Sequence, residues 1–155
     1  MIIRRAAEKD SARILELLSQ VLEIHARIRP DIFLSGTTKY TPAELSVIIR
    51  DDARPIYVAA DESDMVMGYA FCQIKEPSGR GNMVPFRSVF IDDLCVDEAC
   101  RGQGVGKALF HHVVSQAKAL DCYEVTLNVW EGNDAWKFYD AMGMRPKETQ
   151  MELIL

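Results

Sequence analysis

The sequence predicts an α/β domain in which a mixed β-sheet carries helices on both faces. Three observations support this prediction. Apolar stretches of strand length alternate with helical apolar periodicities in the order βαα-βββ-αβαβ. A glycine-rich turn joins a strand to a helix in the second half of the chain. The 155 residues contain no repeat, linker or low-complexity tract, so we expect one domain spanning residues 1–155.

The first half of the chain is expected to contain two helices. Asp10 or Ser11 can cap the first, and His25 near its end is expected to be a partly exposed surface residue or a favourable cation at the helix C-terminus rather than a catalyst. Residues 29–40 have no clear period and form either a substrate-facing segment or an ordinary connection. The sequence Thr41-Pro42-Ala43-Glu44 is a capping box that opens the second helix. The apolar face of the first helix consists of Ile14, Leu17, Leu18, Val21, Leu22 and Ile28.

The other elements follow from β-branched runs, turn residues and helical spacing. A polar turn is expected at residues 61–64. Gly143 is expected to end the last helix as a C-terminal glycine. Strands are expected at residues 2–4, 55–60, 66–74, 88–96, 123–129 and 145–155, and helices at residues 104–120 and from Asn133 or Asp134 to Met142.

The glycine-rich turn carries the clearest chemical signal. Gly102, Gly104 and Gly106 remove side chains just before a helix, so a ligand can approach the backbone closely. Arg101 and Lys107 add positive charge. The first turn of a helix has N–H groups without intrahelical partners and a positive dipole end. The turn is therefore expected to bind a phosphate or diphosphate.

Two common phosphate-binding motifs do not fit this turn. A phosphate loop of the NTPase type needs Ser or Thr after its lysine, but Ala108 follows Lys107. A dinucleotide fingerprint needs a third glycine where the sequence has Lys107 or Leu109, and an acidic residue at the end of the next strand.

The chain resembles the GNAT superfamily of acetyl-CoA-dependent N-acetyltransferases. The matching residues are Leu94-x-Val96, the turn from Arg101 to Gly106, and Phe138-Tyr139 followed by Gly143-Met144. The resemblance extends over nearly the whole chain in element order. It implies a mostly antiparallel central sheet and transfer of an acetyl group from acetyl-CoA to a primary amine by direct attack in a ternary complex. No metal is implied.

The resemblance also implies where acetyl-CoA binds. The pantetheine arm pairs with the strand at Leu94, Cys95 and Val96, as a peptide adds to a sheet edge. The Leu94 and Cys95 amides can then form an oxyanion hole. Asn133 lies six residues before Tyr139, where many members have seven, so Asn133 either contacts the cofactor or only caps the helix. The implied cofactor-binding residues are Leu94, Cys95, Val96, Arg101, Gly102, Gln103, Gly104, Val105, Gly106, Lys107, Asn133 and Tyr139.

Acid–base chemistry is assigned to Asp92 and Tyr139. An alkyl amine is protonated at neutral pH, so a carboxylate can attract it and accept its proton. Asp92 is preferred over Asp93, which alternation places on the opposite face of the strand. A structural carboxylate paired with Arg87, Arg101 or a backbone donor is the alternative. The resemblance assigns Tyr139 as the proton donor to the leaving thiolate.

Composition favours a small cytoplasmic enzyme. The net charge of −5 argues against nucleic-acid or anionic-membrane partners, and no apolar run approaches the length of a membrane span. The four cysteines have no Cys-x-x-Cys pair and are expected to be reduced thiols. A small-molecule or peptide amine is the expected substrate.

Two further points concern assembly and catalysis. The apolar run at residues 151–155 would invite pairing with another chain, so a homodimer is expected. A non-catalytic acyl-CoA-binding sensor or structural subunit on the same fold is the alternative function.

Overall fold

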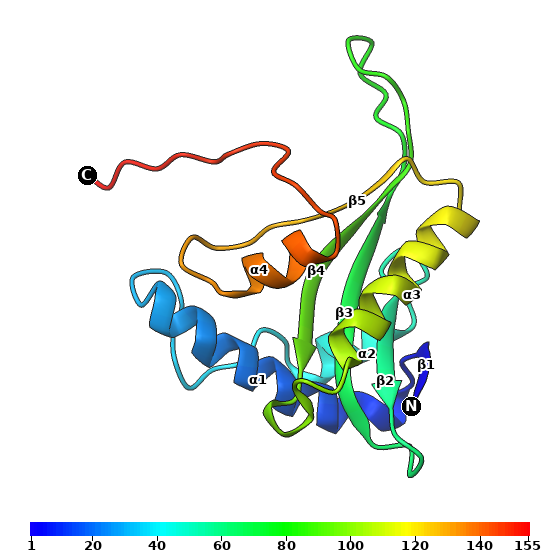
Figure 1. The fold of residues 1–155 in the computed structure, drawn as a ribbon, viewed down its shortest axis with the longest axis vertical. Coiled ribbons are helices and arrows are strands. Elements are labelled where there is room, and N and C mark those ends of the chain that lie inside the picture. Colours follow the sequence, from blue (N-terminus) through cyan, green and yellow to red (C-terminus); the bar gives the residue numbers. More distant parts are fainter.

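The computed structural model describes residues 1–155, and its centre is one five-stranded sheet (Figure 1). The strands lie in chain order across the sheet. The first four are antiparallel to their neighbours and the last two are parallel. The expected mixed, mostly antiparallel sheet is therefore confirmed. The strands are β1 (Ile2–Arg5), β2 (Ile56–Ala60), β3 (Val66–Lys75), β4 (Ser88–Val96) and β5 (Glu124–Leu127).

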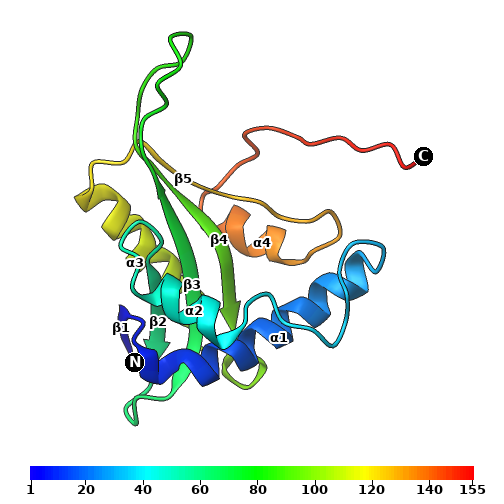
Figure 2. The same ribbon diagram turned by 180° about the vertical axis from the view of Figure 1, so that it is seen from behind.

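Helices cover both faces of the sheet, as predicted (Figures 1 and 2). The helices α1 (Ser11–Ile28) and α2 (Pro42–Ile49) pack on one face, and α3 (Val105–Ala119) packs on the opposite face. The short helix α4 (Ala135–Ala141) packs against the α3 side beside β5. Two 3-10 turns, η1 (Glu8–Asp10) and η2 (Glu98–Cys100), precede α1 and α3. No helix has the length and apolar character needed to cross a bilayer.

Each face of the sheet has its own apolar layer. The close approach of α3 depends on Gly68 in β3, because a Cβ there would lie 2.7 Å from the Cys95 carbonyl oxygen and 3.3 Å from Leu109. No side chain larger than hydrogen fits without a backbone shift. The layer under α1 and α2 includes Ile14, Leu17, Leu45, Tyr69 and Cys95, and the layer under α3 includes Ala70, Ile91, Val105, Leu109 and Val113.

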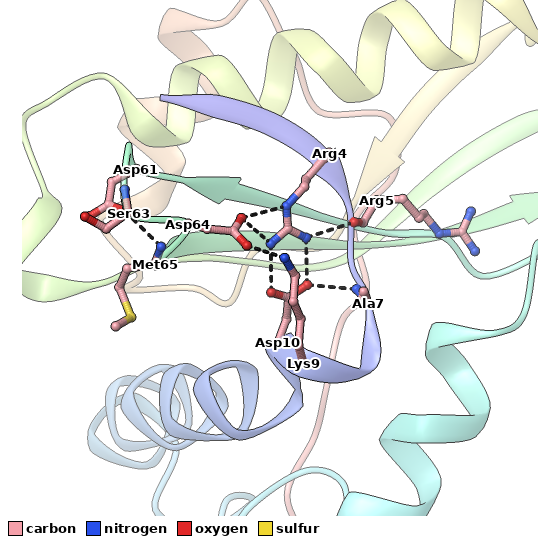
Figure 3. Close-up of polar contacts among 9 residues, drawn as sticks. All are labelled: Arg4, Arg5, Ala7, Lys9, Asp10, Asp61, Ser63, Asp64 and Met65. Atoms are coloured by element: carbon pink, nitrogen blue, oxygen red, sulfur yellow. Dashed lines mark hydrogen bonds and ion pairs between the residues drawn. The ribbon is translucent and has the colours of Figure 1, made fainter.

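Polar contacts centred on Arg4 tie the N-terminal strand to its surroundings (Figure 3). The Arg4 guanidinium donates to the Asp10 carboxylate at 2.7 and 2.9 Å and to Asp64 at 2.8 and 3.1 Å. Asp10 precedes α1, but its side chain does not cap the helix and binds Arg4 instead. Asp61 accepts two backbone N–H groups within residues 61–65, which confirms the predicted turn.

The predicted capping box at the start of α2 is confirmed. The Thr41 hydroxyl accepts the Glu44 backbone N–H at 3.3 Å, and the Glu44 carboxylate accepts the Thr41 N–H at 2.7 Å. The backbone N–H groups of Thr41 and Glu44, which have no partner within the helix, are therefore both hydrogen-bonded.

The predicted strand at residues 145–155 is wrong. This segment has no strand structure and runs away from the body of the molecule as an extended tail (Figure 1). A strand needs a neighbouring strand, and no segment of this chain lies beside the tail to form a ladder. Two side-chain ion pairs fasten it instead: Lys147 with Glu124 at 2.5 Å, and Arg29 with Glu152 at 2.7 Å.

Candidate functional site

The strands β4 and β5 separate half-way along β4. Their parallel pairing runs from Ser88 opposite Glu124 to Ile91 opposite Leu127 and stops there. Beyond Ile91, β4 has no strand partner on this edge, and residues 93–96 pair only with β3. The predicted pantetheine-binding residues 94–96 lie in this unpaired half, which is where an extended chain with amide groups can add to the sheet.

The side chains of Leu94, Cys95 and Val96 pack in the two apolar layers and leave the backbone of these residues for a ligand. Cys95 is buried against α1, and its thiol donates to the Leu17 carbonyl at 3.6 Å. Burial raises the pKa of the Cys95 thiol to about 12, so it is not a ready nucleophile. Leu94 and Val96 pack on the α3 side.

The glycine-rich turn has the conformation and open space that a phosphate site needs. Gly102 and Gly104 have φ angles of +76° and +79°, and a Cβ built on either meets no atom within 4 Å. Gly104 is the N-cap of α3, and no side chain caps this helix end. The first-turn N–H groups of α3 are therefore left for a ligand.

The other turn residues divide between surface and core. Arg101, Gln103 and Lys107 are exposed. Arg101 forms a long ion pair with Glu98 at 3.8 Å and donates through Nε to the Val96 carbonyl at 3.4 Å. The positive charges of Arg101 and Lys107 therefore lie at the surface beside the turn. Val105 is buried beneath the sheet, so only its backbone can contribute to a ligand site. A Cβ at Gly106 would contact Phe138 at 3.5 Å, so this glycine also fits α3 against α4.

A β-bulge brings Asp92 and Asp93 to the same face of β4. Asp93 pairs with Phe71 and Ile91 pairs with Cys72, so Asp92 is an extra residue without a partner on β3. Both aspartates line one groove on the α1 side. The prediction that Asp93 points to the opposite face is therefore wrong, because an inserted residue interrupts the alternation on which it depended.

The two carboxylates have different partners. Asp92 accepts a hydrogen bond from Lys39 Nζ at 2.6 Å, and Asp93 accepts one from the buried Tyr69 hydroxyl at 3.1 Å. Burial raises the pKa of Asp93 to about 6; the negative charge of Asp92 adds to this effect, and Lys39 opposes it. Asp93 is thus a carboxyl group that changes its protonation state near neutral pH. Neither aspartate pairs with Arg87 or Arg101.

The groove beside these carboxylates has a volume of about 330 Å³. Residues 29–40, which have no clear sequence pattern, supply much of its wall. His25 is partly exposed, as expected, and lines the groove; burial together with the charge of Lys39 lowers its pKa. Lys39 was not foreseen, because its partner Asp92 is distant in sequence. The lining consists of Leu18, Val21, Leu22, His25, Ile32, Phe33, Leu34, Thr37, Thr38, Lys39, Asp92, Asp93 and Trp130.

Known proteins share both the sequence pattern and this geometry. A profile of the acetyltransferase (GNAT) family matches residues 18–144. The chain belongs to the GNAT acetyltransferase family.

Named relatives of this GNAT acetyltransferase act on amines. It is 35% identical to glucosamine 6-phosphate N-acetyltransferase of Trypanosoma brucei brucei over 91 residues, which span 58% of each chain. It is 25% identical to thialysine N-epsilon-acetyltransferase of Bos taurus over 154 residues, covering 92% of this chain and 83% of that one. A tetramutant of the BH1408 protein from Bacillus halodurans has 33% identity and a TM-score of 0.95, with both chains covered in full.

In this GNAT acetyltransferase, Tyr139 lies on α4 among aromatic side chains. Its ring centroid is 5.1 Å from that of Phe138 and 6.4 Å from that of Phe110. Its hydroxyl makes no hydrogen bond within the protein. Burial, and then the negative charge of Asp93, raises the pKa of Tyr139 well above its usual value. The hydroxyl is therefore protonated at neutral pH and available to donate.

Asn133 has a structural task at the start of α4. Its side-chain oxygen accepts the Ala135 backbone N–H at 2.9 Å, and its carbonyl accepts the Trp136 N–H at 3.1 Å. The helix ends as predicted at Gly143, which has a φ of +85°. The Gly143 and Met144 N–H groups bond back to Asp140 and Tyr139, the pattern of a Schellman motif.

Proposed function

We propose that this acetyltransferase transfers an acetyl group from acetyl-CoA to a primary amine by direct attack in a ternary complex. The observation that carries the proposal is the separation of β4 from β5 directly before an open, uncapped helix terminus. An unpaired strand edge suits the two amides of the pantetheine arm, and the helix terminus suits its diphosphate.

The residues around the turn fit coenzyme A. The backbone of residues 102–107 and the exposed Arg101 and Lys107 would hold the diphosphate, since both glycines with positive φ leave the space in front of them open. The backbone of Leu94, Cys95 and Val96 would hold the pantetheine arm. Acetyl-CoA supplies an acetyl group activated as a thioester.

Asp93 is the better candidate for the proton acceptor. An alkyl amine has a pKa of ~10.4, so making it neutral at pH 7 costs ~4–5 kcal/mol. A carboxyl group with a pKa of about 6 is largely ionised at pH 7 and closer to the amine in basicity than an ordinary aspartate. Asp92 is held by Lys39 and would help to attract the ammonium group. This assignment moves the base from Asp92 to its neighbour.

Two further groups would act on the other side of the reaction. The Leu94 and Cys95 N–H groups would stabilise negative charge on the acetyl oxygen. Tyr139 would donate its phenolic proton to the sulfur as the thioester bond breaks and the amide bond forms. The ammonium nitrogen loses two protons over the turnover: Asp93 would accept the first before the attack and pass it to solvent, and the second, lost as the amide forms, would replace the proton that Tyr139 gives to the sulfur.

Thiol release from acetyl-CoA tests this proposal against a sensor role. A transferase releases free coenzyme A in proportion to added amine, and the acetylated amine is recovered by mass spectrometry. A panel of primary amines should include glucosamine 6-phosphate and thialysine, because named relatives act on them. Binding of coenzyme A by calorimetry without amine-dependent release from any acceptor would support the sensor and reject the transferase.

We also infer that the protein forms a homodimer. The support is the exposed apolar tail, in which Met151, Leu153, Ile154 and Leu155 touch no partner in the single chain.

A further inference from the structure

The groove beside Asp92 and Asp93 has one apolar wall and a polar end at the two carboxylates. Phe33 stands edge-on to Trp130 with their ring centroids 5.3 Å apart and packs against His25 at 5.1 Å. These three rings form a continuous aromatic wall, contributed by α1, the segment at residues 29–40 and the connection after β5. Aliphatic side chains of α1 and of residues 29–40 complete the lining: Leu18, Val21, Leu22, Ile32 and Leu34.

The groove offers no free cation for an anionic acceptor. Lys39 is its only lysine or arginine, and its ammonium is paired with Asp92 at 2.6 Å. Arg29 lies 5.7 Å from the Trp130 ring, but its guanidinium is held by Asp31 and Glu152 at 2.6 and 2.7 Å. The lowered pKa of His25 keeps its ring neutral at physiological pH. The charged side chain that remains in the groove is the Asp93 carboxyl group, which favours an acceptor with a positive charge.

We propose that the acceptor is a hydrophobic primary amine, of the arylalkylamine class, without a phosphate or carboxylate group. Its ammonium would lie at the Asp92–Asp93 end, and its ring would lie along Phe33 and Trp130, where aromatic faces and edges meet at favourable distances. This inference rests on the proposed amine acetylation and specifies its substrate. It separates the protein from its sugar-phosphate relative, whose acceptor carries an anion that this groove has no free charge to bind.

Acceptor selectivity tests the inference directly. Acetyl-CoA is held constant and kcat/KM is measured for 2-phenylethylamine, ethanolamine, thialysine and glucosamine 6-phosphate. Burial of a phenyl ring should favour phenylethylamine over ethanolamine by ~10–100-fold. A higher kcat/KM for thialysine or glucosamine 6-phosphate would overturn the hydrophobic assignment and leave the transferase function intact. Absence of turnover with every amine would instead reject the transferase function.

A tryptophan pair gives a matched set of variants. Trp130→Ala should lower kcat/KM for phenylethylamine by ~10-fold or more, mainly through KM, and should leave ethanolamine nearly unchanged. Trp136→Ala is the control, because Trp136 is an exposed residue of α4 outside the groove. Equal losses for both acceptors in Trp130→Ala would contradict a ring-binding role.

Binding can also be followed without turnover. The chain has two tryptophans, so Trp136→Phe leaves Trp130 as the only indole. With coenzyme A present, phenylethylamine should change the fluorescence of this variant saturably, and ethanolamine at the same concentration should not. An unchanged signal up to millimolar phenylethylamine would overturn the proposed position of the ring.

The ion pair provides a second test of charge. Asp92→Asn removes the partner of Lys39 and leaves a free ammonium group in the groove. The ratio of kcat/KM for thialysine to that for phenylethylamine should rise ~10-fold, because the carboxylate of thialysine gains a charge-assisted partner in the freed Lys39 ammonium. An unchanged ratio would show that Lys39 does not set the exclusion of anions.

Discussion

Among single residues, Asp93 is the one in which folding and chemistry oppose each other. Burial favours its neutral form, whereas accepting a proton from an amine requires the ionised form. A carboxyl group whose pKa is raised on folding contributes stability at low pH, and this contribution is lost as the pH rises through about 6. The protein is therefore expected to give up stability at neutral pH at the position where it needs a base.

Asp93→Asn should therefore stabilise the fold at pH 7.5 while reducing activity. Asparagine can still accept the Tyr69 hydrogen bond and carries no charge to bury. We expect the free energy of unfolding to rise by ~1–3 kcal/mol at pH 7.5, and the gain to vanish below pH ~4, where both side chains are neutral. Urea unfolding at the two pH values measures this. Asp92→Asn is the control and should give no gain, because it breaks the Lys39 ion pair; a loss of stability in Asp93→Asn at pH 7.5 would contradict the prediction.

Tyr139 and Asp93 should differ in how their defects respond to pH. The Tyr139 hydroxyl makes no hydrogen bond in the protein, so Tyr139→Phe should leave the fold intact. Because it removes the proposed proton donor, it should lower kcat by ~10²-fold with little effect on KM for acetyl-CoA. Asp93→Asn should lower kcat/KM for the amine, and this loss should shrink towards pH ~10 as the free amine becomes neutral. Rates measured from pH 6 to 10 separate the two. Parallel, pH-independent defects would mean that Asp93 is not the base.

At this scale, local chemistry was predictable and spatial pairing was not. The aspartate pair and Tyr139 were singled out from sequence, but their roles depended on neighbours far along the chain. Lys39 and Tyr69 lie 53 and 24 residues from the aspartates they contact. One extra residue on β4 also reversed the expected direction of Asp93, and no composition signal marks such a bulge.

At the scale of elements, the turn before α3 makes the most specific prediction. In Gly104→Asp the new residue tolerates the positive φ of this position, but its carboxylate enters the space proposed for the diphosphate. Acetyl-CoA affinity should fall by ~10–100-fold, the size of one or more charge-assisted hydrogen bonds. Gly36→Asp is the matched control, with a φ of +75° and equal free space outside the turn. Calorimetry showing equal affinity in both variants would remove the turn from the coenzyme site.

Elements marked by caps, turns or strand patterns in their own residues were predicted correctly. The last strand, predicted at residues 145–155, was not, because a strand also needs a partner from elsewhere in the chain. The capping box of α2, the glycine end of α4 and the strand at residues 88–96 rest on neighbouring residues and are confirmed. The last strand was predicted from its apolar residues alone. Such a run makes a strand only where a sheet edge accepts it, and that depends on the arrangement of the whole chain.

At the scale of the whole molecule, the C-terminal tail, residues 145–155, exposes apolar side chains that nothing in the single chain covers. Leu153 and Ile154 are 85% and 75% exposed, and the tail extends well beyond the sheet (Figure 2). Unpaired apolar backbone of this kind is prone to association with another chain. The Arg29–Glu152 ion pair anchors the tail near its end and close to the groove, so a partner held by the tail would lie close to the proposed acceptor site.

We therefore expect light scattering at micromolar concentration to give the mass of a dimer. Removing residues 151–155 should give a folded monomer, because the apolar side chains of these residues are exposed in the single chain and only Glu152 contacts the body, through its ion pair with Arg29. Val84→Asp is the control, since Val84 is equally exposed on the β3–β4 connection. A monomeric mass for the full chain would refute the dimer.

The bulge at Asp92 also divides β4 into two halves that are out of phase. Before it, odd-numbered residues such as Val89 and Ile91 face α3; after it, odd-numbered residues such as Cys95 face α1. Deleting Asp92 would therefore remove one carboxylate and little else. Ile91 and Asp93 would follow each other opposite Cys72 and Phe71, and residues 93–96 would keep the faces that they have now. Replacing the bulge by a regular strand thus leaves both apolar layers unchanged, and we expect a relative with one residue fewer here to share the core and to lack one of the two groove carboxylates.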